Sequence, residues 1–149
     1  MRKILLALFV GCGALIASCD HFHTSENDVL DGFWQLTDVD TLATGHSGDV
    51  KHLMIFWAVN ANLLEIRDMR DMPDAHIHVF FRFKRQGNQL TLSDPVADDR
   101  FISDSIITDV NTIRYYGLSH LTETLKILRL DSKKMTLESE RLRMYFRKY

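Results

Sequence analysis

The chain has little cysteine and no hydrophobic run long enough to cross a membrane. Its two cysteines, Cys12 and Cys19, lie near the start of a chain of 149 residues, so the rest must fold without a disulfide. The uncharged run from Ile4 to Ala17 holds fourteen residues. A helix that rises ~1.5 Å per residue needs about 20 to span the hydrocarbon core. This run is therefore not predicted to be a transmembrane helix.

A strong excess of charge and the common catalytic motifs are also absent. The formal net charge of the chain is −2, which gives no reason to expect a nucleic-acid partner. The sequence contains no Walker loop, no His-Glu-x-x-His zinc motif and no dinucleotide-binding fingerprint. None of its serines lies in a Gly-x-Ser-x-Gly elbow. We therefore expect no catalytic residues and no cofactor, and predict that the protein is not an enzyme.

The N-terminal residues have the pattern of an export signal. Arg2 and Lys3 precede the apolar run and small residues follow it, as in secretory signal peptides. The segment ends Ile16-Ala17-Ser18-Cys19, which resembles the lipobox of bacterial lipoproteins. That resemblance implies that the Cys19 sulfur receives a diacylglycerol, that a peptidase cuts just before it, and that the new amine is acylated. Several acyl chains anchor a protein stably in a membrane, whereas one chain binds only marginally.

Cys12, in Phe9-Val10-Gly11-Cys12, is the competing lipidation site. It lacks the pair of small residues, and cleavage there would leave a hydrophobic run too short to engage the export machinery. We therefore assign lipidation to Cys19 and predict a membrane-anchored lipoprotein of the cell envelope, on the periplasmic face or in the outer membrane. Residues 1–18 are then the signal peptide, residues 19–30 a polar tether and residues 31–149 one domain. Cleavage removes two basic side chains and no acidic one, so the formal charge falls to −4.

From Gly32 onward the dominant hydrophobic period is two, which is typical of β-strands. Trp34 and Leu36 alternate with polar neighbours, while the segment Leu53–Val59 is apolar on both faces, as expected where something covers its outer side. The Gln86-Gly87-Asn88 turn predicts a hairpin. The predicted strands cover residues 33–38, 53–59, 64–67, 76–85, 89–93, 125–130, 135–139 and 141–147.

The pattern weakens between Asp98 and His120. Spacings among Phe101, Ile102, Ser105 and Ile106 allow one or two helical turns, and Val110–Tyr116 is predicted as an additional strand. Seven or eight short strands without a long helix predict an all-β, antiparallel sandwich or barrel. The interior of an eight-stranded barrel is just wide enough for side chains or one small ligand.

These residues are similar to the lipocalin-like lipoproteins of Bacteroidetes. Gly32-Phe33-Trp34 resembles the lipocalin Gly-x-Trp signature, and Tyr116-Gly117-Leu118 with the closing hairpin resembles the end of those small barrels. The resemblance spans about residues 31–149 and implies an up-and-down eight-stranded barrel that binds an apolar ligand. Lipocalins stack an arginine near the last strand over the motif tryptophan. Here alternation places Arg143 and Arg147 on the face opposite the apolar residues.

A ligand inside such a barrel would contact its inward-facing apolar side chains. The predicted ligand-binding residues are Trp34, Leu36, Trp57, Phe81, Phe83 and Phe146. Two functions remain open: a carrier of a small apolar or amphipathic ligand, which the resemblance favours, and a self-filled barrel that contacts another envelope protein. The basic face of the last strand is either solvated or meets an acidic partner or anionic head groups; it consists of Arg141, Arg143 and Arg147, followed by Lys148.

Two groups of polar residues have the composition of metal ligands. His76-x-His78 places two imidazoles on one strand face, which can chelate zinc or copper if Asp74 or a neighbouring strand supplies a third ligand. The acids Asp68, Asp71 and Asp74 match no EF-hand spacing. An exposed strand face and a solvated loop explain both groups, so we expect no metal.

Overall fold

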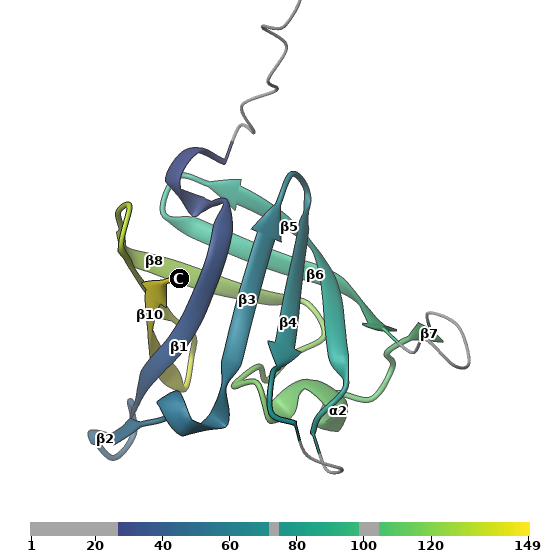
Figure 1. The fold of residues 1–149 in the computed structure, drawn as a ribbon, viewed down its shortest axis with the longest axis horizontal. Helices are drawn as coiled ribbons and strands as arrows, with labels where there is room; N and C mark the ends of the chain where they lie inside the picture. Colours follow the sequence, from purple (N-terminus) through teal and green to yellow (C-terminus); the bar gives the residue numbers. More distant parts are fainter. Residues whose placement is uncertain (1–26, 72–74, 99–104) are drawn as a thin grey trace, which may run out of the picture.

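The computed structural model describes residues 27–71, 75–98 and 105–149, which form one closed antiparallel barrel (Figure 1). Eight strands make the wall, each hydrogen-bonded to the next along the chain, and the last closes on the first. They are β1 (Gly32–Thr41), β3 (Ile55–Asn60), β4 (Leu63–Asp68), β5 (His78–Gln86), β6 (Gln89–Asp98), β8 (Glu123–Leu130), β9 (Lys134–Glu138) and β10 (Leu142–Lys148). The predicted up-and-down eight-stranded barrel is confirmed.

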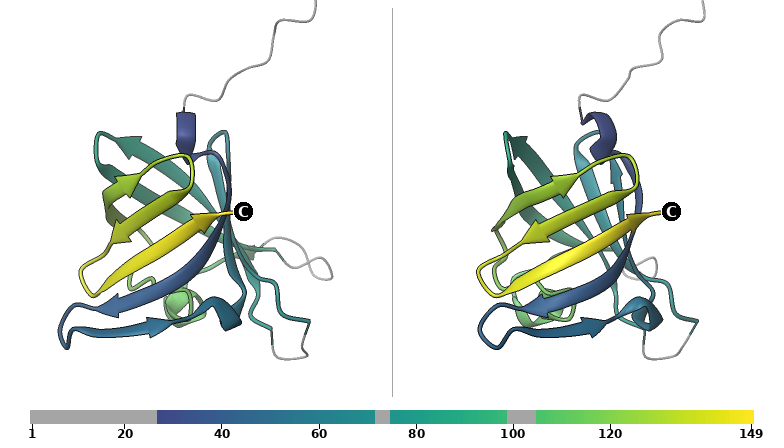
Figure 2. Two further views of the ribbon diagram at one scale, coloured as in Figure 1. Left: turned by 60° about the vertical axis from the view of Figure 1, so that its left-hand side comes forward. Right: turned by 90° about the vertical axis from the view of Figure 1, so that its left-hand side faces the viewer.

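Two short strands and three helical segments are added to this wall. Strand β2 (His46–Asp49) pairs with β1, and β7 (Ser105–Ile106) pairs with β6. The helical segments are η1 (Asp28–Leu30), η2 (Lys51–Leu53) and α2 (Asn111–Arg114). Segment η1 lies at one end of the barrel and α2 at the other (Figures 1 and 2). Among the described residues, no helix is long and apolar enough to span a bilayer.

The prediction of a strand over Val110–Tyr116 is wrong, because the centre of this segment is the helix α2. Of the helical turns expected over 101–106, residues 101–104 lie outside the described part, and Ser105–Ile106 is the strand β7. The hairpin at Gly87 is confirmed, and its second strand continues to Asp98. The signal peptide, Cys19 and most of the tether also lie outside the described residues.

The barrel core is made by the alternating inward side chains that the period of two predicts. Buried side chains close both ends of the barrel. Leu30 of η1 is fully buried at one end, and Ile113, Tyr116 and Leu118 are buried at the α2 end. Burial of this apolar surface is the main favourable contribution to folding. Leu30 belongs to the segment that the sequence assigned to the tether, so the packed domain includes η1.

The outer side of β3 is covered by aromatic side chains. Phe56 points outward but is only 3% exposed, because Phe33 stacks on it at a centroid distance of 4.7 Å. The ring of Tyr149 meets Phe56 edge-on at 5.4 Å. The two-sided apolar pattern of this strand therefore reflects a local aromatic cluster formed with β1 and the last residue of the chain.

Candidate functional site

The predicted ligand-binding residues lie in the packed interior. Trp34 and Trp57 are fully buried, and the other inward residues except Phe83 are no more than 3% exposed. The rings of Trp57 and Phe146 are 4.9 Å apart. Phe83 is half-buried and packs against the core cluster. The structure thus brings these residues together in one hydrophobic core; whether they bind a ligand stays a prediction.

The residues of the Gly-x-Trp motif meet the last strand. Trp34 pairs with Lys148 in the β1–β10 register, and the Lys148 ammonium lies 4.9 Å from the centroid of the Trp34 ring. That ammonium also donates a hydrogen bond to the carbonyl of Val29, and the indole N–H of Trp34 donates one to the carbonyl of Leu30. Gly32 permits this approach, since a Cβ there would lie 2.6 Å from Lys148 Cε. The motif therefore joins η1, β1 and β10 at one end of the barrel.

In lipocalins an arginine stacks over the motif tryptophan, whereas here Lys148 lies over Trp34. Arg143 instead bonds to the Glu138 carboxylate at 2.7 Å, and Arg147 donates to the side-chain oxygen of Gln35. Lys148 was counted with the basic face of the last strand in the sequence, but its side chain bends over the barrel end. The contact between the Lys148 ammonium and the Trp34 ring therefore has the same cation–π component that an arginine would supply.

Asp68 organises the opposite end of the barrel. Its carboxylate is buried and accepts hydrogen bonds from the Arg70 guanidinium and from the backbone N–H groups of Arg70 and His76. Burial alone would raise the pKa of Asp68, but these hydrogen bonds outweigh it and hold the pKa well below its usual range. The carboxylate is therefore ionised in the folded protein at neutral pH and holds Arg70 and His76 at the end of β4.

Tyr116 connects the same end to α2. Its hydroxyl donates a hydrogen bond to the carbonyl of Ile77 at 2.5 Å. Burial, followed by the negative charge of Asp68, raises the pKa of this phenol. The ring of His76 stacks on Tyr115 at a centroid distance of 3.4 Å. The helix is thus docked on the barrel by aromatic contacts and by this partly buried hydrogen bond.

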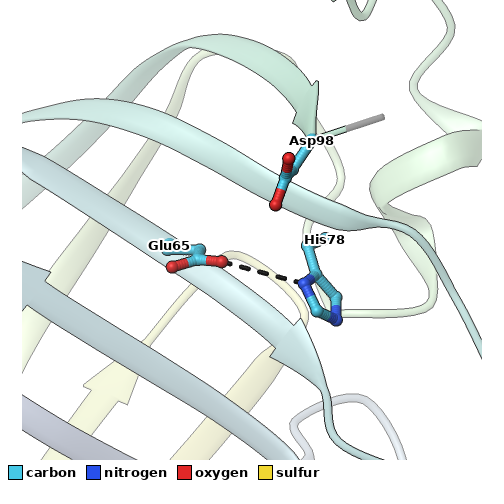
Figure 3. A group of neighbouring side chains, drawn as sticks. All are labelled: Glu65, His78 and Asp98. Carbon is cyan, nitrogen blue, oxygen red and sulfur yellow. Dashed lines mark ion pairs between the residues drawn. The ribbon is translucent and has the colours of Figure 1, made fainter. Parts of the chain in front are cut away.

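The two histidines of the His76-x-His78 pattern have different surroundings. His76 faces Asp68 and Tyr115, whereas His78 lies on the outer wall beside Glu65 of β4 and Asp98 of β6 (Figure 3). Sequence reasoning missed Glu65 altogether and took Asp68 for part of a solvated loop. The signal for Asp68 was present, because it continues the inward alternation of Leu64 and Ile66.

The described residues line two open pockets that bear on the function of the barrel. The first, of about 690 Å³, is called the β1–β10 pocket, and Phe146 and Met135 contribute to its lining. Its polar lining includes the cations Lys51, Arg129, Lys134 and Arg147 and the carboxylates Asp38 and Asp40. The second, of about 330 Å³, is called the β5–β6 pocket. It is lined by Leu63, Phe80, Phe81, Arg82, Asp94 and Val96.

An eight-stranded meander whose first strand opens with Gly-x-Trp, and whose last strand places a cation over that tryptophan, defines a small barrel of the lipocalin type. The family model described as "Lipocalin-like domain" matches residues 14–149, and the chain belongs to this family.

Two solved structures have the same fold. A lipocalin-like protein from Bacteroides uniformis is 21% identical with a TM-score of 0.61, over 81% of this chain and 99% of that one. An uncharacterized protein from Bacteroides eggerthii is 18% identical with a TM-score of 0.60, over 80% of this chain and 98% of that one. No curated protein matches the sequence significantly.

Proposed function

We propose that this protein is a membrane-anchored lipoprotein of the cell envelope, held by a lipidated Cys19, and that its barrel is a scaffold that binds another envelope protein through its outer surface. It performs this role without catalysis. This is the second of the two functions that the sequence left open, and one observation favours it over the carrier: the interior is filled by the protein's own side chains.

The burial of the interior carries the proposal. A cavity that holds a ligand, open or sealed, leaves part of its wall accessible to a water-sized sphere. Trp34, Trp57, Leu90 and Leu92 leave no such surface, and Phe81 leaves 1%. Leu30 and the α2 end close the two mouths in the same way. A barrel with a filled interior would bind a partner through its outer wall.

The β1–β10 pocket is the part of the outer wall best suited to a protein partner. Four cations and two carboxylates surround it, and the aromatic cluster of Phe33, Phe56 and Tyr149 lies on neighbouring strands, with Tyr149 77% exposed. Arginine and tyrosine are over-represented at protein interfaces. Lys51 and Arg129 are paired with Asp49 and Asp131, so Lys134 and Arg147 are the cations that a partner with acidic side chains would meet.

The test is site-specific photo-crosslinking in cells. A photoreactive amino acid at Lys134, which lines the β1–β10 pocket, is expected to give one discrete adduct with an envelope protein. The same amino acid at Lys84, an exposed residue on β5, is the control and should give none. Charge reversal by Arg147→Glu should weaken the adduct. Equal labelling from both positions, or none from Lys134, would refute the proposed surface.

The anchor is tested separately. Metabolic labelling with a clickable fatty acid should label the wild-type chain and the Cys12→Ala variant but not Cys19→Ala, because no neighbouring residue offers a thiol for the lipid. Persistent labelling of Cys19→Ala would contradict the lipobox assignment and leave the surface proposal to its own test.

Binding of a small amphipathic ligand is the second candidate function, and the β5–β6 pocket favours it. Leu63, Phe80 and Val96 give this pocket an apolar lining, while Arg82 and Asp94 supply one charge of each sign. Its volume of about 330 Å³ is at the lower end of the range for ligand pockets. Native mass spectrometry of the purified protein would reveal a co-purified small molecule, and Val96→Arg should then abolish its retention.

A further inference from the structure

Three side chains from neighbouring strands converge on the outer wall, beside the β5–β6 pocket, whose lining residue Phe80 is the register partner of Glu65. His78 of β5 lies directly opposite Asp98 of β6 in the strand register, and Glu65 of β4 is diagonal to His78, since its own partner is Phe80. One ligand atom from each of the three lies within 4.8 Å of the others. Figure 3 shows the Glu65 carboxylate and the His78 ring facing each other, with Asp98 beside them.

The Glu65 carboxylate has one oxygen that lacks a hydrogen-bond donor among the described residues. Its side chain is 8% exposed, and Oε2 accepts a hydrogen bond from Arg67 at 2.5 Å. Within the described part of the chain, the buried Oε1 has no hydrogen-bond donor. The Nδ1 atom of His78 is 3.8 Å from it, beyond the length of a hydrogen bond. A buried carboxylate oxygen that accepts no hydrogen bond is costly, so this position favours a cation.

We propose that Glu65, His78 and Asp98 bind one first-row divalent transition-metal ion, for which zinc is the reference. An imidazole nitrogen with two carboxylate oxygens is a donor set that suits such ions, whereas calcium takes six to eight oxygens. Zinc holds these ligands at ~2.0–2.2 Å, so the three atoms must draw together slightly. Rotation of the half-buried His78 and Asp98 side chains supplies that movement.

The charges at the site are compatible with such an ion. Two carboxylates and the Arg67 guanidinium give a net charge of −1 before binding and +1 with a divalent ion. Arg67 occupies only Oε2 of Glu65 and leaves Oε1 for the metal. Three protein ligands leave a fourth position toward solvent, for a water molecule or a side chain of a bound protein. The proposal does not depend on the function proposed above.

Zinc titration by isothermal calorimetry tests the site. The full chain is used in mild detergent with Cys12→Ser and Cys19→Ser, so that no thiol competes. We expect one saturable zinc at this site and no comparable binding of calcium or magnesium. His78→Ala should weaken the affinity by roughly 100-fold or more, because loss of a direct ligand exceeds the 10–100-fold effect of a supporting residue. Glu65→Gln and Asp98→Asn should each weaken it at least about 10-fold.

His120→Ala is the matched control. The exposed ring of His120 lies 3.6 Å from one carboxylate, that of Glu140, and belongs to no three-ligand cluster within the described residues, so its removal should leave the affinity unchanged. Circular dichroism with a chelator present checks that each variant is folded, and Asp98→Asn alters only a half-buried side chain. Zinc affinity that is the same in His78→Ala and in its parent would overturn the proposal, wherever else the zinc binds. Absence of saturable binding would overturn it too.

Discussion

At the scale of single residues, Gly32 has two separate reasons to lack a side chain. Its φ of +127° is a conformation that other residues rarely adopt, and a Cβ there would approach Lys148 Cε to 2.6 Å. The first reason is backbone strain and the second is a steric contact with the lysine over Trp34. They can be separated by mutation.

We predict that Gly32→Ala lowers the free energy of unfolding by about 2–4 kcal/mol, from strain and overpacking together. The Lys148→Ala substitution should lower the free energy of unfolding less in the Gly32→Ala background than in the wild type, because in that background it also removes the clash with the new Cβ. Gly45→Ala is the control, since Gly45 has φ +66° but open space at Cβ. Urea unfolding measures all four variants. Strict additivity of the two changes would show that the contact with Lys148 is unimportant.

Asp68→Asn should destabilise the protein in a pH-dependent manner. Its folded pKa is depressed, so its contribution is complete above the ordinary aspartate pKa of ~3.9 and disappears as the pH falls through the folded value. At pH 7 the variant should lose about 2–3 kcal/mol, because the hydrogen bonds that the buried carboxylate accepts from Arg70 and His76 are weakened when its charge is removed.

Urea unfolding between pH 7 and pH 2 checks the prediction for Asp68. The difference from wild type should be constant near neutrality and shrink below about pH 4. Asp71→Asn, an exposed position in the same loop, should stay within about 0.5 kcal/mol of wild type throughout. A difference for Asp68→Asn that grows as the pH falls would contradict the assigned role of the carboxylate.

The polar residues of the site were the least predictable from the sequence. Alternation placed Trp34, Leu36, Phe81 and Phe146 inside correctly, because a strand with one buried face leaves a simple period of two. It cannot say which outward residues of different strands meet. Glu65, His78 and Asp98 come together only through the register of three strands, and a one-residue shift would separate them.

At the scale of elements, the strands were predictable and the segment before β8 was not. Strand β2 has mostly exposed residues, so its sequence shows no apolar alternation from which a strand could be predicted. In the α2 region, the apolar residues Ile107, Val110, Ile113 and Tyr116 recur every third position, which fits a tight helical turn. The β-branched residues of this segment favoured a strand by propensity, but the docking of Ile113 and Tyr116 on the barrel end overrides that preference.

Helix α2 is expected to be a structural plug. Ile113→Ala should cost about 2–5 kcal/mol, since Ile113 is fully buried at the barrel end. Asn111→Ala in the same helix alters an exposed side chain and should change stability by less than about 0.5 kcal/mol. Thermal or urea unfolding measures both. A loss below 1 kcal/mol for Ile113→Ala would show that the helix packs only loosely against the barrel.

At the scale of the whole molecule, barrel closure and core filling belong together. In the closing pair β1–β10, Trp34 lies opposite Lys148 and Leu36 lies opposite Phe146. The Phe146 ring also packs against the ring of Trp57, which belongs to β3, the other neighbour of β1. The sequence pattern predicted seven or eight strands joined mostly by short turns, and the resemblance to lipocalin-like proteins implied eight of them in an up-and-down order. Whether large inward residues fill the barrel depends on their packing in three dimensions, which no period in the sequence contains.

Phe81→Ala distinguishes a filled barrel from a ligand carrier. Phe81 is 1% exposed and packs within the core cluster, so its truncation should open a void and cost about 3–5 kcal/mol. Phe83, which is half-buried on the same strand, is the control, and Phe83→Ala should lower the free energy of unfolding by less.

The void should also let xenon or benzene raise the melting temperature of Phe81→Ala but not of the wild type, because small apolar cavities bind such probes. A loss nearer ~1.5–3 kcal/mol, the transfer contribution alone, together with stoichiometric binding of a fluorescent apolar probe to the wild type, would instead support the carrier.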